Sequence, residues 1–89
     1  MTALVCIAAI ALEISKIEWC LIVISITAVW SAEAMNTAIE NLMDFVSPEL
    51  HPLARRTKDA AAGAVLVVAI GAAIVGGIIF LPHILALAG

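Results

Sequence analysis

The sequence has few charged residues, and its last third has none. Residues 60–89 contain no Asp, Glu, Lys or Arg, and residues 3–12 and 19–32 are uncharged as well. Apolar residues make up 65% of the 89 residues, compared with roughly half in a soluble domain, and the mean hydropathy is +1.23. This composition excludes an ordinary soluble domain. It predicts a membrane protein in which residues 1–89 form one structural unit.

Cysteine and histidine are too scarce to indicate a metal site. Cys6 and Cys20 lie in apolar surroundings, and the chain has no C-x-x-C motif or Cys/His cluster, which argues against a metal–thiolate site. His51 and His83 have no second ligand at a suitable spacing, so we assign neither a role. The first residues also lack the basic segment with which a secretory signal begins.

Three apolar stretches predict an all-α bundle of three transmembrane helices, at about residues 2–12, 17–46 and 58–86. A helix needs about 20 residues to cross a bilayer, so the first helix is short and covers about half of the hydrocarbon core. The segment EISKIE, residues 13–18, is predicted to form one connection. Residues 47–57 are predicted to form the other, because Pro48 and Pro52 break helices there.

The basic residues predict how the helices are oriented. Arg55, Arg56 and Lys58 lie in or beside the second connection, whereas the first has only Lys16. The positive-inside rule therefore places the second connection and the N-terminus in the cytoplasm, and the C-terminus outside.

Small residues recur on the last apolar helix, which predicts close packing against another helix. Ala69, Ala73 and Gly77 lie four residues apart, and Ala72 and Gly76 form a parallel row. Such small-xxx-small rows let helix backbones approach closely in lipid. The partner could be a helix of the same chain or of another copy.

The stretch EAMNTAIENLMD, residues 33–44, places polar groups where the chain is otherwise apolar. On a helix they share one face about 100° wide. We call this face the acidic wall; it consists of Glu33, Asn36, Thr37, Glu40 and Asp44. Simple solvation at a helix end would explain Asp44 and Glu40 better than the deeper Glu33. A carboxylate near the hydrocarbon is costly and usually marks a functional site.

The acidic wall has groups that phosphoryl transfer requires. Mg²⁺ prefers oxygen ligands and takes one or two carboxylates together with phosphates. The reaction also needs a base and a cation for the phosphates, and Lys58 and Asp59 are predicted at the same membrane face. The alternative for this pair is a snorkelling lysine beside a helix N-terminal aspartate. An ion-coupled carrier would also use intramembrane acids, but it would not need the Lys–Asp pair.

The motifs E-x-x-N-T-A-I-E-x-x-x-D, from residue 33, and K-D-x-A-A-G-A-V, from residue 58, resemble those of the small prokaryotic diacylglycerol kinase and undecaprenol kinase family. The resemblance covers residues 10–85. It implies a homotrimer in the bacterial inner membrane that transfers the γ-phosphate of MgATP to a lipid alcohol at the cytoplasmic face. The expected partners are the membrane and undecaprenol or diacylglycerol, with no nucleic acid. The forms N-T-A-I-E and A-A-G-A-V are more similar to the undecaprenol kinase branch.

The resemblance also implies a role for each matching residue. Glu33 matches the general base aimed at the lipid hydroxyl, Asn36 a polar catalytic residue beside it, and Glu40 a magnesium ligand. The ATP side of the site would consist of Asp44, the phosphate-binding Lys58, and Asp59.

The start of the sequence departs from the family pattern. Family members usually begin with an amphipathic surface helix, whose glutamate shares the metal with the equivalent of Glu40. Here Met1 falls within the first predicted transmembrane helix. We therefore expect half of the metal site and part of the nucleotide cover to be absent from this chain. The alternative to an active kinase is a catalytically incomplete fragment or degenerate paralogue that only packs in the membrane.

Overall fold

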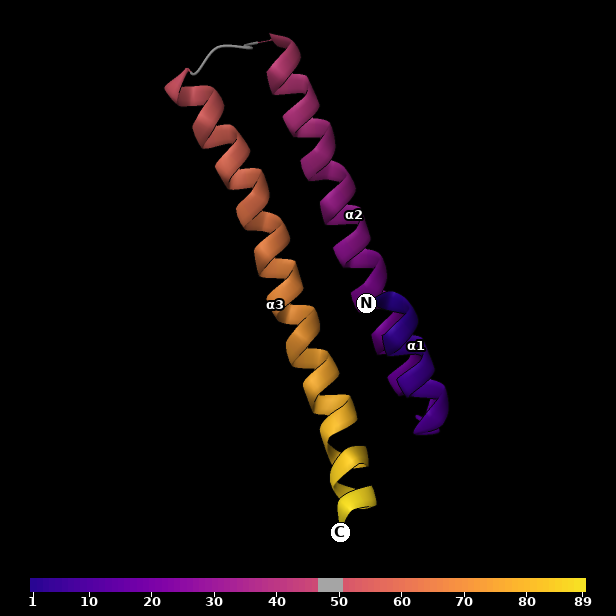
Figure 1. Cartoon of the computed structure of the whole chain (residues 1–89). Coiled ribbons are helices and arrows are strands. Elements are labelled where there is room, and N and C mark those ends of the chain that lie inside the picture. The colour runs from indigo at the N-terminus through magenta and orange to yellow at the C-terminus, as the bar shows by residue number, and fades with distance from the viewer. Residues whose placement is uncertain (47–50) are drawn as a thin grey trace.

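The computed structural model describes residues 1–46 and 51–89, and its elements within these residues are α-helices. The helices are α1 (Thr2–Ala11), α2 (Lys16–Val46) and α3 (Pro52–Ala88). Figure 1 shows α2 and α3 side by side and antiparallel, with α1 at the level of the first half of α2. The rod measures 56 × 18 × 18 Å. Both α2 and α3 are long and apolar enough to cross a membrane, whereas α1 is shorter, so the prediction of an all-α membrane bundle is confirmed.

The third helix begins at Pro52 rather than at residue 58. Proline at the first helical position has no N–H to leave unsatisfied, and its fixed φ suits a helix start. His51 precedes it as the N-cap, and its Nδ1 accepts a hydrogen bond from the Leu53 N–H at 3.1 Å. Pro52 therefore starts a helix where the sequence analysis expected it to break one, and the second connection ends earlier than predicted. Residues 47–50, which include Pro48, lie outside the described residues.

The first connection is a tight reversal at residues 12–15, slightly earlier than predicted. The Glu13 N–H donates to the Ile10 carbonyl (3.2 Å) and the Ile14 N–H donates to the Ala9 carbonyl (3.4 Å). These two bonds form a Schellman motif, which satisfies the last carbonyls of α1. Glu13 has φ = 52°, a conformation that glycine adopts more easily. Ile14 and Ala9 are both buried in the same cluster, which fixes the reversal.

A capping box begins α2. The Ser15 N–H donates to Glu18 Oε1 at 3.0 Å, and the Glu18 N–H donates to Ser15 Oγ at 3.2 Å. The pattern Ser-x-x-Glu is readable from sequence, because each side chain satisfies an N–H that the helix start leaves free. Glu18 is consequently held close to the surface of its own helix.

The main packing seam joins α2 and α3. Buried and half-buried positions recur along both helices at alternating spacings of three and four residues, as in a coiled coil. On α2 the seam consists of Glu18, Ile22, Ser25, Val29, Ala32, Asn36, Ile39 and Met43. On α3 it consists of Ala54, Lys58, Ala61, Val65, Val68, Ala72, Val75, Ile79 and His83.

Only part of the predicted small-residue rows lies in this seam. Ala72 belongs to the seam, Ala69 and Gly76 are half-buried beside it, and Ala73 and Gly77 are exposed. A Cβ built on Gly76 or Gly77 would meet nothing within 4 Å. The close backbone approach that these glycines permit is therefore not used within one chain.

An apolar cluster closes the end of the molecule where α1 meets the other two helices. Its buried members are Ala9, Ile14, Ile22 and Ile79. At the opposite end of α1, Trp30 Nε1 donates a hydrogen bond to Thr2 Oγ1 at 3.0 Å. These contacts hold α1 against the first half of α2.

The left-handed backbone at Glu13 yields a prediction about stability. Glu13→Val should lower the free energy of unfolding by about 1–2 kcal/mol, because a β-branched side chain is strained at positive φ. Glu13→Gly should leave stability unchanged or raise it. The measurement is the thermal midpoint of the detergent-solubilised protein, with Glu13→Asn as the matched control, since asparagine tolerates this conformation. Equal thermal midpoints for Glu13→Val and Glu13→Asn would show that the backbone at residue 13 does not disfavour a β-branched side chain.

Candidate functional site at one end of the α2–α3 pair

The acidic wall lies on the second half of α2, which is continuous helix through Val46. Glu33, Thr37, Glu40 and Asp44 are exposed, and Asn36 is half-buried in the seam with α3. The Thr37 hydroxyl donates to the backbone carbonyl of Glu33 at 3.0 Å. The wall therefore presents three carboxylates to the surroundings, while its amide lies at the edge nearest α3.

Asn36 has one amide atom engaged and one free. Its Nδ2 donates to Glu40 Oε1 at 3.4 Å, a long hydrogen bond. Its Oδ1 is buried and accepts no hydrogen bond from the described residues. Leaving a buried acceptor unpaired costs about 1–3 kcal/mol, so such atoms usually have a structural or functional explanation. The amide nitrogen, in contrast, points to the exposed carboxylate of Glu40.

Lys58 of α3 contacts the wall directly. Its Nζ forms an ion pair with Asp44 Oδ1, and the lysine side chain is 37% exposed. The two residues are 14 positions apart in sequence and meet because α3 folds back along α2. The structure therefore brings the lysine to Asp44, which lies on the same half of α2 as Glu33 and Glu40.

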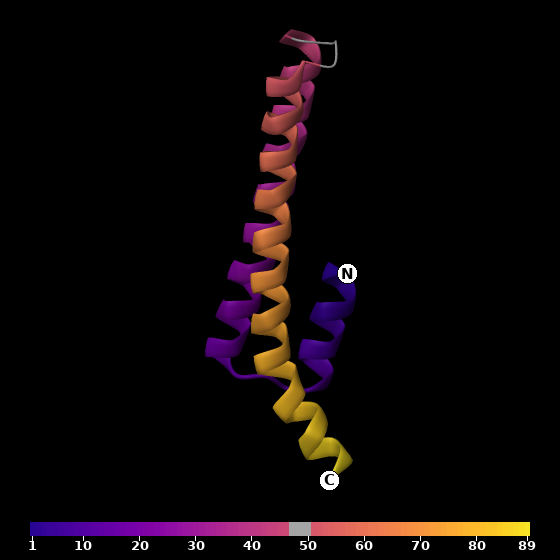
Figure 2. The same cartoon turned by 90° about the vertical axis from the view of Figure 1, so that its left-hand side faces the viewer.

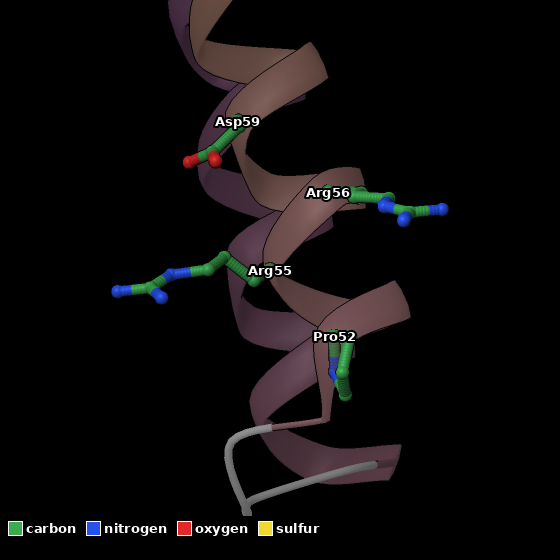
Figure 3. Close-up of a pocket in the computed structure, with 4 residues that line it drawn as sticks. All are labelled: Pro52, Arg55, Arg56 and Asp59. Carbon is green, nitrogen blue, oxygen red and sulfur yellow. The ribbon is translucent and has the colours of Figure 1, made fainter.

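Asp59 lies on a different side of α3 from this ion pair. Successive residues on a helix are about 100° apart, so Asp59 lines a shallow pocket of about 250 Å³ instead. The other lining residues are Pro52, Arg55 and Arg56. Figure 3 shows the two arginine side chains extending to opposite sides of α3, with Asp59 on the Arg55 side. The sequence analysis used both arginines only as markers of orientation.

The candidate site is elongated along the helix axis. Glu33 precedes Asp44 by eleven residues, which is about 16 Å along α2. Glu40 lies between them, about 6 Å from Asp44. The chain thus arranges Glu33, Glu40 and the Asp44–Lys58 pair in this order along α2, and a ligand that reaches all three must be extended.

The described residues do not form a protein-only metal cage, since no group of three His, Cys, Asp or Glu side chains converges among them. Glu40 nevertheless offers an exposed carboxylate, one oxygen of which accepts a hydrogen bond from Asn36 Nδ2. Magnesium usually keeps waters and binds through one or two carboxylates plus substrate phosphates. The donor set therefore fits a magnesium ion shared with a nucleotide.

The model of the prokaryotic diacylglycerol kinase family matches residues 1–80, which include both motifs of the site. The chain belongs to this family. The resemblance predicted from the two motifs is confirmed, and with it the classification as an integral membrane protein built of helices.

Individual relatives show the same relationship. The chain is 49% identical over 72 residues to an undecaprenol kinase of Bacillus subtilis, a match covering 81% of this chain and 58% of that protein. It is 44% identical over 80 residues to a diacylglycerol kinase of Synechocystis, a match covering 89% of this chain and 42% of that protein. A diacylglycerol kinase of Escherichia coli is 35% identical over 72 residues, a match covering 81% of this chain and 59% of that protein. The chain spans about half the length of these relatives, and no solved structure matches it.

Both histidines make contacts that the sequence analysis missed. His51 caps α3, a role that its position before Pro52 and Leu53 makes readable. His83 Nε2 lies 3.2 Å from Glu18 Oε1 and 3.3 Å from Oε2. No local pattern indicates this contact, because 65 residues separate the partners.

The Asp44–Lys58 pair should contribute little to stability, since both side chains are more than a third exposed. A double-mutant cycle with Asp44→Asn and Lys58→Met should give a coupling of about 0.2–1 kcal/mol. The measurement is unfolding in a detergent series, and the coupling should shrink at high salt. A coupling above about 3 kcal/mol, or one that salt leaves unchanged, would show that the pair is buried in the membrane-embedded protein.

Proposed function

We propose that this chain belongs to a lipid kinase that transfers the γ-phosphate of MgATP to a lipid alcohol at the cytoplasmic face of the bacterial inner membrane. The supporting observation is the ion pair between Lys58 and Asp44, which brings a cation of α3 to the carboxylates of α2. The α2–α3 pair then carries three groups in order along its length: Lys58 as the phosphate-binding cation, Glu40 as the metal-binding carboxylate, and Glu33 as the deeper carboxylate.

We favour undecaprenol over diacylglycerol as the acceptor. The relative named undecaprenol kinase is 49% identical to this chain, compared with 44% and 35% for two relatives named diacylglycerol kinase. The N-T-A-I-E form of the motif agrees with this choice. Both acceptors present a primary alcohol at the membrane surface, so the same reaction would serve either.

In the proposed reaction, Glu33 acts as the general base. It lies deepest in the wall and is exposed, where a lipid hydroxyl can reach it. Glu33 takes the hydroxyl proton, the alcohol oxygen forms a bond to the γ-phosphorus, and the bond from that phosphorus to the bridging oxygen breaks, releasing ADP. Asn36 would be the polar catalytic residue beside Glu33, and its Nδ2 donates to Glu40 Oε1.

The nucleotide would occupy the shallower part of the site. Magnesium held by Glu40 would neutralise charge on the phosphates. Lys58 would bind a phosphate as a point charge, and Asp44 would hold the lysine in place until the nucleotide arrives. Asp59 lies on a different side of α3 and would contact only a part of the nucleotide that extends into the pocket shared with Arg55.

We also propose that the chain assembles as a homotrimer with this end in the cytoplasm. Glu33 and Glu40 are exposed in one chain, which leaves the wall open to a neighbouring copy. Basic residues concentrate at the start of α3, where Arg55 and Arg56 lie on its first turns. This arrangement follows the positive-inside rule.

Substitution of the two central carboxylates tests the reaction. In the natural gene product purified in lipid nanodiscs, Glu33→Gln should lower kcat at least about 100-fold, the usual contribution of a general base. Glu40→Gln should also lower activity severely, because magnesium would lose its carboxylate ligand. The assay follows labelled γ-phosphate into undecaprenol and diacylglycerol. Glu13→Gln makes the same chemical change at the other end of the molecule and should have no effect.

Several outcomes would contradict the proposal. Full activity in Glu33→Gln or in Glu40→Gln would remove the role given to that residue. Absence of transfer to either lipid by the unsubstituted protein would refute the kinase. A preference for diacylglycerol would refute the acceptor that we favour.

Lys58 should act on the nucleotide rather than on the lipid. Lys58→Ala should raise the KM for ATP about 10-fold or more, while Lys58→Arg should keep part of the affinity because the charge remains. The KM for the lipid should change little. Lys16→Ala removes a lysine at the other end of α2 and is the control. An unchanged KM for ATP in Lys58→Ala would show that the lysine is only an interfacial anchor.

A further inference from the structure

Contacts between polar side chains join α2 and α3 at both ends of the pair. At one end Asp44 meets Lys58, and at the other Glu18 meets His83 through both carboxylate oxygens. The His83 and Glu18 side chains are 31% and 27% exposed, so this second contact is the more enclosed one. All four residues lie in or next to the seam.

The two contacts have matched spacings along the two helices. Glu18 and Asp44 are 26 residues apart on α2, and Lys58 and His83 are 25 residues apart on α3. These separations correspond to about 39 Å and about 38 Å. Because the helices are antiparallel and the spacings agree, both contacts form together in one axial register.

The rest of the seam does little to choose that register. Apart from Ser25, Asn36 and Met43, its other positions are Ala, Val or Ile and repeat every seven residues. A slide of one heptad, about 10 Å, would again place mostly small and aliphatic side chains opposite each other, and the Asn36 side chain makes its one hydrogen bond within α2, to Glu40. In lipid no hydrophobic driving force separates the two arrangements, since the acyl chains are equally apolar. Polar groups in an apolar seam can specify register even when they add little stability.

Glu18 is well suited to define a reference point. Its carboxylate already accepts the Ser15 N–H in the capping box, so its position is fixed by its own helix. On α3 the partner follows Pro82, which lies inside the helix and removes one backbone hydrogen bond. Figure 2 shows the last turns of α3 bending away from the line of the helix. The contact with Glu18 ties this bend to α2.

We propose that Glu18 and His83 are a remote positioning pair that fixes the axial register of α3 on α2 and thereby sets where Lys58 lies along the acidic wall. The statement about Lys58 rests on the proposed function; the statement about register does not. α3 is continuous between the two residues, so a shift at His83 moves Lys58 as well. A one-residue shift is about 1.5 Å, and a misplacement of about 1 Å can cost 100-fold in rate.

The register can be measured without any activity. In the natural protein with Cys6→Ala and Cys20→Ala, spin labels at Ala28→Cys and Ala73→Cys report the distance between exposed positions of α2 and α3. Labelled protein is diluted with unlabelled protein in nanodiscs, so that each oligomer has one labelled copy. The parent should give one narrow distance distribution. His83→Leu should broaden or shift it by at least about 1.5 Å.

Matched variants distinguish loss of the Glu18–His83 contact from a change in side-chain size at position 83. His83→Lys keeps a hydrogen-bond donor opposite Glu18 and should restore the narrow distribution. Glu18→Gln keeps the capping box, which accepts glutamine, but removes the charge, and should broaden the distribution as His83→Leu does. Because Glu18→Gln changes few atoms, it also tests the inference if His83→Leu does not fold.

Kinetics test the second half of the inference. His83→Leu should lower kcat about 10-fold and raise the KM for ATP, and His83→Lys should stay close to the parent. An unchanged distribution in both His83→Leu and Glu18→Gln would overturn the register role. A shifted distribution with unchanged kinetics would overturn the link to Lys58. Failure of the parent to transfer phosphate would refute the proposed function and leave the register result standing.

Discussion

The seam between α2 and α3 is the contact on which the candidate site depends. Each helix satisfies its own backbone hydrogen bonds, as a membrane requires, so neither needs the other to form. What their pairing adds is the placement of Lys58 against Asp44. Since burial in lipid gives no net hydrophobic gain, that placement rests on close packing of small side chains and on a few polar contacts at chosen positions.

The helices and the chemical character of the site were predictable because both follow from local pattern. Uncharged stretches indicate where the helices that can cross a membrane lie. The spacing of Glu33, Asn36 and Glu40 places these residues along one side of α2 once that segment is helical. The start of α3 was mispredicted because a proline has opposite effects inside a helix and at its first position. His51, placed immediately before Pro52, was the signal that could have decided between the two.

The relation between helices was much harder to predict. The three-four spacing in α2 and α3 was present in the sequence, but apolar residues occupy almost every position of a membrane helix, which hides the seam among lipid-facing side chains. Contacts such as Glu18 with His83 depend on how the chain folds back, and no local rule encodes a partner 65 residues away. The elongated form of the site, with Glu33 well separated from Lys58, likewise follows from helix geometry and pairing together.

The hydrogen bond from the Thr37 hydroxyl to the Glu33 carbonyl limits what the family motif can say about the lipid. A hydroxyl has one proton to donate, and that of Thr37 is already donated to the backbone of its own helix. A serine at this position would donate the same hydrogen bond. Exchange of threonine for serine here therefore leaves the surface offered to a substrate nearly unchanged. The N-T-A-I-E form of the motif therefore supports undecaprenol only as a sign of relationship, and discrimination between lipid alcohols would reside in other side chains.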